Sequence, residues 1–270
     1  MKAVKIDNLS FSYNTYYALN GINLELDKGK KVVVLGANGS GKTTLFYHFN
    51  GLLLPQAGKI EILGTKITKN TCREIRQKVG MVFENPDNQL ISTSVYDDIA
   101  FGLRNYRWSE EYIKKRVYYA LSKVEAEELV ESSPYNLSWG QKKRIAIAGV
   151  LAMEPELLVL DEPFTGLDPQ VSNNLLKLLD ELNSEGKTII IAAHDVDLAY
   201  SWGDEVVILS RGKKIRQGPP DILADEEEME RAFLATPILA EAFKDTPYRP
   251  KNIKEARSAL EKLMKNNGDE

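Results

Sequence analysis

A glycine-rich segment of eight residues constrains this chain more than any other feature. Residues 36–43 read G-A-N-G-S-G-K-T and fit G-x-x-x-x-G-K-[ST], the pattern of a phosphate-binding P-loop. An apolar run at 32–35 precedes the segment and a helix-like run follows it, as this loop requires. Its glycines let backbone N–H groups converge on phosphate oxygens, while Lys42 adds a positive charge and Thr43 a hydroxyl for Mg²⁺. The alternative is a chance glycine-rich turn, which would leave the match at every fixed position unexplained.

The composition is that of an ordinary globular protein and argues against several functions. Of 270 residues, 43% are hydrophobic and 27% are charged, with a formal net charge of −4. This balance argues against general affinity for nucleic acid or anionic membranes. The single cysteine, Cys72, excludes a disulfide within the chain and favours a reducing compartment. The apolar runs are only of strand length and no signal peptide is apparent, so we expect a partner to supply any membrane attachment.

The hydrophobic pattern predicts an α/β fold. Strands are predicted at residues 4–6, 22–26, 32–35, 58–63, 78–83, 157–162, 188–193, 206–210 and 214–217. A turn is predicted at 10–15. The helix after the P-loop is expected to end near Gly51 and to use His48 for packing. From about 84 to 154 the pattern becomes helical, with a 3.6-residue apolar period at 112–124, which predicts a helical subdomain inserted into the α/β core.

Two predicted strands end in residues suited to phosphoryl chemistry. Open α/β sheets bind ligands at the carboxyl ends of their strands. Asp161 is therefore placed to hold Mg²⁺, and Glu162 to take a proton from an attacking water. His194 follows the next strand, where it either belongs to the core, caps a helix or contacts a γ-phosphate. With the P-loop, these residues indicate phosphoryl transfer.

Residues 138–144 are predicted to open a helix that extends to Met153. Ser138 is a suitable N-cap. Three basic residues follow in the first turns, where they oppose the helix dipole. Lys142 and Lys143 either form a solvated basic face or have a functional role, and the sequence favours neither alternative.

Beyond two prolines at 219–220 the chain reads as a series of helices. An acidic run opens one helix at 225, a second is predicted at 237–243, and a third at 253–264. The third has an apolar stripe formed by Ile253, Ala256, Leu260, Leu263 and Met264. This segment either covers its own core or offers a surface for dimerisation or another partner. Residues 266–270 are predicted to be disordered.

Five motifs occur in the order found in ATP-binding cassette (ABC) ATPases, and the chain resembles that family over about residues 4–218. The motifs are the P-loop, residues 137–141, the strand ending in Asp161 and Glu162, the turn at 166–168, and His194. The resemblance implies a P-loop NTPase (RecA-like) core at 1–218, with an N-terminal antiparallel β subdomain and a helical subdomain at about 84–154. A C-terminal helical extension at 219–270 follows. It also implies a head-to-tail dimer that closes on two ATP molecules.

The resemblance implies a role for each site residue. ATP is expected to be bound by Tyr13, which would stack on adenine, and by Gly36, Asn38, Gly39, Ser40, Gly41, Lys42, Thr43 and Thr44. Mg²⁺ is expected on Thr43 and Asp161, and the catalytic residues are Lys42, Glu162 and His194. The signature residues Ser138, Gly140 and Gln141 would serve the ATP held by the partner's P-loop. Asp168 belongs to the D-loop and Glu84 to the Q-loop.

A narrower resemblance is to the ATPases of energy-coupling-factor and cobalt/nickel-type importers. It is carried by residues 82–89, 95–102 and 141–153. It implies a transmembrane scaffold protein whose coupling helices enter a groove on each ATPase, a substrate-binding membrane protein, and a location at the cytoplasmic face of the cell membrane, with no nucleic acid. Glu84, Asp87, Asp97 and Asp98 would give that groove a negative wall, unless they are ordinary solvated carboxylates. Vitamin or metal-ion cargo, and a homo- or heterodimer, remain open.

Two residues depart from the family pattern. Glu84 stands where the family has Gln, and a negative charge roughly 4 Å from a γ-phosphate costs on the order of 4 kcal/mol at an effective dielectric of about 20. We expect Glu84 to make closure of the site depend on Mg²⁺ or on an arginine of the membrane partner. Trp139 stands where the family usually has glycine. Because Gly140 remains for close backbone approach, we expect Trp139 to point away from the nucleotide.

Other classes of ABC ATPase fit the sequence less well. A ribosome-acting ATPase would carry two cassettes, and a DNA-repair ATPase would need a long coiled coil where only about 95 residues separate Lys42 from Ser138. A non-catalytic regulator would be expected to lack Glu162 or His194. The sequence therefore predicts ATP hydrolysis by in-line attack of water on the γ-phosphate, coupled to transport; another type of ABC transporter ATPase or a non-transport ABC ATPase is the alternative.

Overall fold

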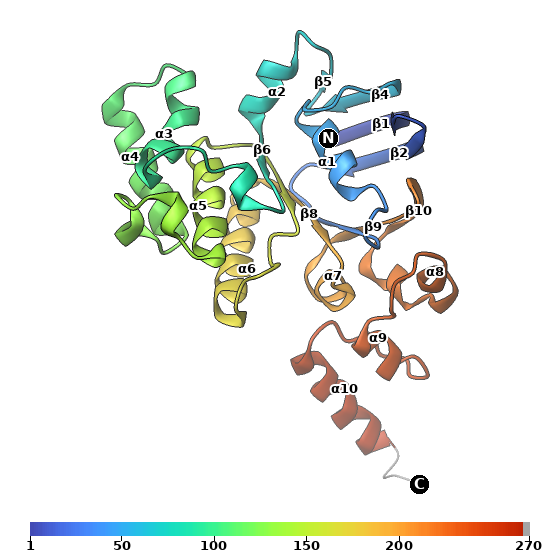
Figure 1. Ribbon diagram of the computed structural model, residues 1–270. Coiled ribbons are helices and arrows are strands. Elements are labelled where there is room, and N and C mark those ends of the chain that lie inside the picture. Colours follow the sequence, from blue (N-terminus) through green and yellow to red (C-terminus); the bar gives the residue numbers. More distant parts are fainter. Residues whose placement is uncertain (267–270) are drawn as a thin grey trace.

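Two β-sheets form the centre of the molecule, with helices around them (Figure 1). The computed structural model describes residues 1–266. The larger sheet has the order β10-β9-β3-β8-β7-β6, in which β10 is antiparallel to β9 and the other neighbours are parallel. Its strands are β3 (Lys31–Leu35), β6 (Val79–Val82), β7 (Leu157–Asp161), β8 (Thr188–Ala193), β9 (Glu205–Ser210) and β10 (Lys213–Gly218).

The smaller sheet is antiparallel and has the order β2-β1-β4-β5. Its strands are β1 (Lys2–Tyr13), β2 (Tyr16–Asp27), β4 (Ala57–Ile62) and β5 (Thr65–Lys66). The predicted turn at 10–15 is too long: β1 and β2 pair as far as Tyr13 and Tyr16, and the turn between them is short. Asn14 makes this tight reversal possible by adopting a left-handed backbone with φ of 52°.

Ten α-helices are present in the described chain. They are α1 (Lys42–Phe49), α2 (Cys72–Lys78), α3 (Val95–Asn105), α4 (Glu110–Lys123), α5 (Trp139–Ala152), α6 (Pro169–Ser184), α7 (Val196–Trp202), α8 (Glu226–Arg231), α9 (Ile238–Ala242) and α10 (Ile253–Asn266). Four short 3₁₀ helices lie at Pro86–Asn88, Glu127–Leu129, Pro134–Asn136 and Pro220–Ala224. The sequence patterns do not predict α2, α7 or β5, which are too short to show a period. No helix among residues 1–266 is long and apolar enough to cross a membrane.

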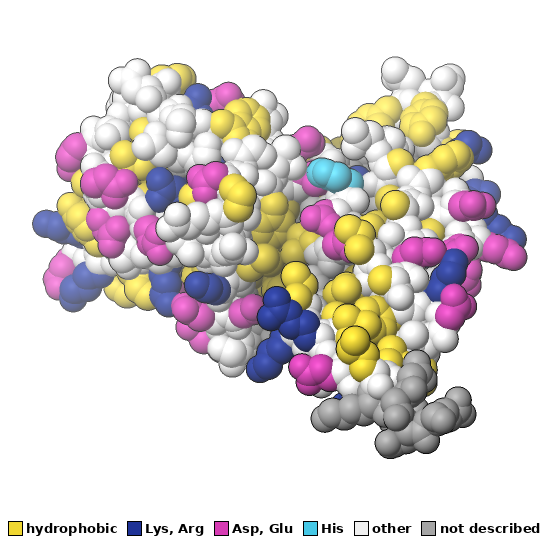
Figure 2. Space-filling model, turned by 90° about the horizontal axis from the view of Figure 1, so that it is seen from below, with side chains coloured by type: hydrophobic (Ala, Val, Ile, Leu, Met, Phe, Trp, Pro, Cys, Tyr) yellow, Lys and Arg dark blue, Asp and Glu magenta, His cyan; other side chains and the backbone are white. Residues whose placement is uncertain are grey.

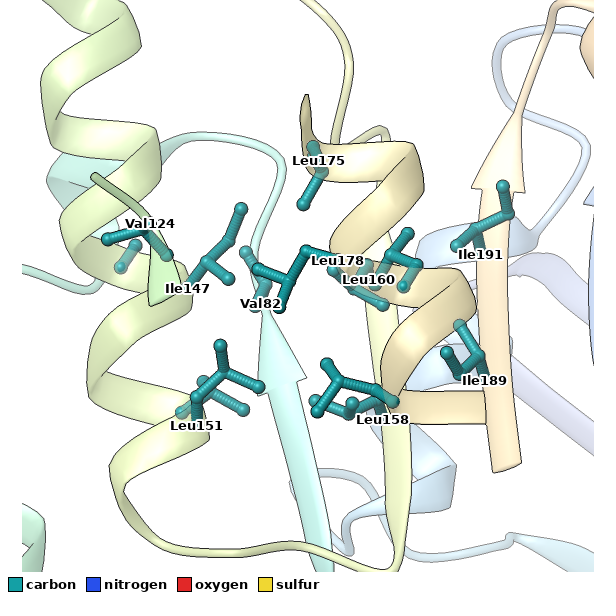
Figure 3. Packing of buried hydrophobic residues seen from close by; sticks show 14 of the residues in the cluster. Val82, Val124, Ile147, Leu151, Leu158, Leu160, Leu175, Leu178, Ile189 and Ile191 are labelled. Carbon is teal, nitrogen blue, oxygen red and sulfur yellow. The ribbon is translucent and has the colours of Figure 1, made fainter. Parts of the chain in front are cut away.

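The central strands are apolar on both sides because both faces of the larger sheet are covered. Leu158 and Leu160 of β7 lie in one hydrophobic cluster and face Leu178 of α6 (Figure 3). Val159, between them, lies in the other cluster with Phe46 of α1 and the smaller sheet. Each such buried side chain stabilises the fold by about 1.5–3 kcal/mol relative to exposure. The α/β fold predicted from these apolar runs is confirmed.

Among the helices between β6 and β7, α4 has the expected amphipathic pattern. In α4, the residues at the predicted period, Ile113, Val117, Ala120 and Leu121, are fully buried. Contacts of α4 and α3 with α5 join these helices into one group, which Figure 1 shows on the far side of the larger sheet from β1 and β2.

The C-terminal segment forms α8, α9 and α10, and Figure 1 shows α10 at the end of the molecule farthest from the smaller sheet. The predicted apolar stripe of α10 is only partly correct. Ala256 is buried with Ala259, whereas Ile253, Leu260 and Met264 are exposed. The small side chains of these two alanines let α10 pack closely against Phe243 in the preceding part of the extension. Residue 266 is helical, and residues 267–270 of the segment predicted to be disordered lie outside the described residues.

Candidate functional site

The topology brings the predicted chemical groups to one edge of the larger sheet. Strands β3, β6, β7 and β8 run parallel, so the residues after their carboxyl ends lie together. A cavity of about 760 Å³ opens there. It is lined by Tyr13, Tyr16, Ala18, residues 37–44, Glu84, Asp161, Glu162, Thr165, His194 and residues 233–235. On the face shown in Figure 2, a histidine and acidic side chains lie beside a notch between two bulges of the surface.

The P-loop folds around its own lysine. Lys42 is buried, and its Nζ donates to the carbonyl oxygen of Gly36 at 2.7 Å and lies 3.7 Å from Glu162 Oε1. Gly36 supports the loop from behind and does not line the cavity. Gly41 has φ of 109°, and a Cβ there would lie 2.6 Å from the Ala18 carbonyl oxygen, so only glycine fits. The loop is therefore held open toward the cavity by backbone geometry that its glycines permit.

Asp161 has a buried oxygen that is free to bind a cation. Within the described chain its Oδ1 has no hydrogen-bond partner, although the residue is 1% exposed. Burial raises the pKa of Asp161, and the Thr43 hydroxyl opposes this rise. A buried carboxylate oxygen beside a hydroxyl suits Mg²⁺, which takes few protein ligands when phosphate oxygens complete its shell. These residues therefore fit the ion.

Glu162 and His194 contact each other at the cavity. Glu162 Oε2 and His194 Nδ1 are 2.9 Å apart. Glu162 has φ of 45°, a backbone conformation that costs a non-glycine residue about 1–3 kcal/mol and is found at functional sites. His194 is exposed, and it is Asp195 that caps α7 by accepting from the Leu198 N–H. Of the alternatives for His194, the structure excludes core packing and capping.

The cavity also combines aromatic residues that are far apart in the sequence. Tyr13 lies there with Tyr16, both at the β1–β2 turn. Phe233, 61% exposed, lines the same cavity from the C-terminal segment, and the Arg211 guanidinium lies 4.9 Å from its ring centroid. Sequence reasoning missed residues 233–235. These residues follow α8 in a turn, where Phe233 has a left-handed φ of 59°.

The signature residues do not line this cavity. Ser138 and Gln141 form a capping box, in which each side chain accepts a hydrogen bond from the other's backbone N–H. Trp139 also lies outside the cavity lining, and its indole N–H donates to the Thr165 carbonyl oxygen at 3.3 Å. The ring packs against Gly166, where a Cβ would lie 2.5 Å from it.

Asp168, the D-loop residue, likewise lies outside the cavity. Its Oδ1 accepts from the Val171 N–H at 2.9 Å and so caps α6.

The basic residues of α5 are not a solvated face. Lys142 Nζ lies 2.7 Å from Asp87 Oδ1. Lys143 is 0% exposed, and its Nζ donates to the carbonyl oxygens of Phe83 and Glu84. Arg144 donates to two carbonyl groups after the end of α4. The solvated alternative is therefore wrong for Lys143, because tertiary contacts place it beneath the Q-loop.

A second hollow, of about 310 Å³, lies between α3, α5 and β6. Of the four carboxylates expected in the groove for coupling helices, only Asp98 is among the residues that line this hollow, which are otherwise mostly apolar. Asp98 Oδ1 accepts from the N–H groups of Ile91 and Ser92. Asp97 pairs with Arg104 at 3.0 Å, Asp87 pairs with Lys142, and Glu84 faces the larger cavity.

Comparisons with known proteins agree with this fold and site. The family model for ABC transporters matches residues 19–165. The energy-coupling factor transporter ATP-binding protein EcfA of Carboxydothermus hydrogenoformans is 44% identical over 266 residues, covering 97% of this chain and 98% of the relative. The protein of that name from Methanococcus maripaludis is 46% identical over 244 residues, covering 89% and 88%.

Solved structures show the same fold. CbiO1 from Clostridium perfringens, part of the ABC transporter complex CbiONQ, has a TM-score of 0.75 and 41% identity, covering 90% of this chain and 99% of that one. A dimeric ATP-binding cassette in a post-hydrolysis state, bound to ADP and Pi, has a TM-score of 0.75 and 29% identity, covering 80% and 98%. The chain thus belongs to the ABC transporter family, as a nucleotide-binding ATPase related to the energy-coupling factor ATP-binding proteins.

Proposed function

We propose that this chain is the ATPase subunit of an importer of the energy-coupling-factor type, which drives uptake of a vitamin or of cobalt or nickel ions. The observation that carries the proposal is the single cavity joining the P-loop to Asp161, Glu162 and His194. The names of the relatives support the importer assignment over another ABC transporter or a non-transport ATPase.

In the proposed reaction, a water attacks the γ-phosphate of ATP in line with the leaving group. Lys42 and the P-loop N–H groups bind the phosphate oxygens, with Ser40, Thr43 and Thr44 beside them. Glu162 accepts the proton of the attacking water, and His194, held by Glu162, contacts the γ-phosphate. Mg²⁺ would be held by Thr43 and Asp161 and would neutralise charge on the phosphate oxygens. Tyr13 would stack on the adenine.

The complete unit is proposed to be a dimer of cassettes. Ser138, Gly140 and Gln141 lie outside the chain's own cavity, which supports their assignment to the ATP held by a second chain's P-loop. Asp168 would lie at the same dimer interface. The cassette would comprise residues 1–218, with residues 219–270 as an extension.

The membrane partners would dock at the hollow between α3 and α5. That hollow is mostly apolar, so apolar side chains of a scaffold protein's coupling helices suit it better than a row of arginines. Such docking would hold the ATPase at the cytoplasmic face of the membrane, with a substrate-binding membrane protein in the same complex. Co-purification with hydrophobic membrane proteins, rather than with ribosomes or DNA, is the expected outcome.

Glu162→Gln tests the proposed catalytic role. The variant keeps the shape of the side chain but removes the base, so we expect ATP binding within about threefold of the wild type and turnover lower by at least about 100-fold. Calorimetric titration with ATP and a phosphate-release assay measure the two quantities. Glu61→Gln, an exposed change on β4, is the matched control. Turnover retained in Glu162→Gln would remove Glu162 from this role.

A further inference from the structure

Lys143 is a fully buried cation that the proposed reaction does not use. It lies in the second turn of α5, and its Nζ donates to the carbonyl oxygens of Glu84 at 2.6 Å and Phe83 at 3.2 Å. A buried ammonium is costly unless it is hydrogen-bonded and near opposite charge. Its hydrogen-bond partners among the described residues are neutral carbonyls, so the compensating charge lies elsewhere.

That compensating charge comes from the acidic groups of the cavity. Burial lowers the pKa of Lys143, attraction by Asp161, Glu84 and Glu162 opposes this shift, and the resulting pKa is about 8. Lys143 is therefore protonated at pH 7, and Glu84, whose carbonyl oxygen it binds, lines the cavity. Lys42 is the second buried lysine of this region, and it contacts Glu162 rather than Glu84.

We propose that Lys143 is a positioning residue that makes a carboxylate tolerable at position 84 of the Q-loop. Its ammonium holds the 83–84 backbone in place, and its charge offsets the Glu84 carboxylate on the side where nucleotide phosphates bind. The required counter-charge is thus built into the chain rather than supplied only by Mg²⁺ or a partner arginine. The inference rests on the proposed binding of ATP in this cavity.

The link also joins two motifs within one chain. The helix that carries Lys143 begins at the capping box of Ser138 and Gln141, the signature residues. A movement of α5 therefore pulls on the 83–84 backbone through one hydrogen bond to the Phe83 carbonyl and one to the Glu84 carbonyl. The Q-loop of one site and the signature assigned to the other site are connected by a single rigid helix.

A double-mutant cycle separates the charge of Lys143 from its hydrogen bonds. Lys143→Gln keeps N–H donors for the two carbonyls but removes the charge, whereas Lys143→Met removes both. Each is made with Glu84 and with Glu84→Gln, and binding of AMP-PNP with Mg²⁺ is measured by calorimetry. With Glu84 present, we expect Lys143→Gln to raise the Kd for AMP-PNP about tenfold. In the Glu84→Gln background the rise should be about threefold or less, because the effects of two neighbouring charges on binding depend on each other. For ADP, which lacks the γ-phosphate, the coupling should be smaller.

Each outcome decides the inference. The counter-charge role is wrong if Lys143→Gln binds AMP-PNP like the wild type. It is also wrong if the substitution raises Kd by the same factor with Glu84 and with Glu84→Gln, because Lys143 then only tethers the loop. Lys142→Gln, at the neighbouring residue paired with Asp87, is the matched control and should stay within about twofold. If Lys143→Met does not fold, the Lys143→Gln cycle still decides. Failure of the wild type to bind AMP-PNP would instead contradict the proposed function itself.

Discussion

The two histidines of the chain show how environment decides what one residue type does. His194 is exposed, follows β8 and contacts Glu162 at 2.9 Å. His48 is fully buried in α1, where its Nδ1–H donates to the Thr44 carbonyl oxygen at 2.7 Å. An exposed imidazole with one acidic partner can change contacts when a ligand arrives, whereas a buried imidazole in a packed helix cannot. We therefore expect changes at His194 to affect catalysis and changes at His48 to affect stability.

His194→Ala should lower turnover while leaving the fold intact. Removing one donor to a developing phosphate charge commonly costs about 10²–10³-fold in kcat. Because the side chain is exposed, the thermal midpoint should move by no more than about 2 °C. A phosphate-release assay and a melting curve on the same preparation measure both. A kcat within about threefold of the wild type would show that His194 does not act in the reaction.

At the scale of elements, α1 joins the site to the core. It begins at Lys42, the lysine of the P-loop, and buries Leu45, Phe46 and Phe49 between the two sheets. His48 completes the buried face against the ring of Phe11, with centroids 5.0 Å apart. Protonation would place a charge in this buried site, so the fold is more stable with a neutral imidazole.

The stability of the fold should therefore fall as the pH drops below about 6.5, the ordinary pKa of histidine. Burial lowers the pKa of His48, and its backbone hydrogen bonds oppose this shift only in part. The unfolded chain then binds a proton that the folded chain does not, which costs up to about 1.4 kcal/mol per pH unit. Urea unfolding at pH 7.0 and 5.5 should show a larger loss of stability for the wild type than for His48→Gln. Equal losses would assign the pH dependence to other groups.

At the scale of the whole molecule, the C-terminal segment takes part in the nucleotide cavity. Residues 233–235 line it together with Tyr13 and Tyr16 from the opposite end of the sequence. The Arg211 guanidinium lies over the Phe233 ring and so steadies an otherwise exposed side chain. Gly212, next to Arg211, donates its N–H to the Ser40 carbonyl oxygen of the P-loop at 3.0 Å. The extension thus contacts Arg211, and the neighbouring Gly212 is hydrogen-bonded to the P-loop.

Phe233→Ala should weaken nucleotide binding about two- to tenfold, because a ring beside a base contributes about 0.5–1.5 kcal/mol beyond its buried area. Calorimetric titration with ADP measures the change without hydrolysis. Ile238→Ala, equally exposed on α9 but outside the cavity lining, is the control and should bind ADP like the wild type. An unchanged Kd in Phe233→Ala would show that Phe233 does not contribute to nucleotide binding and that the C-terminal segment only covers its own core.

Much of the fold was predictable because it depends on local sequence. Apolar runs mark the buried strands, the 3.6-residue period marks α4, and Ser138 marks the start of α5. The C-terminal helices appear at their predicted places, but the buried face of α10 was predicted only in part. Which side of a helix is covered depends on what packs there, and a periodic pattern does not contain that information.

The sequence by itself determined the phosphate-binding loop and the order of the motifs, since glycine φ angles and strand ends follow from residues adjacent in the chain. Only the tertiary structure decided that Lys143 binds the Glu84 carbonyl and that Phe233 lines the same cavity as Tyr13. It also decided that Asp97 and Asp87 form ion pairs with basic side chains. These contacts join segments far apart in the chain. Charge and exposure at such positions are set by the neighbours that folding brings, and no local pattern names those neighbours.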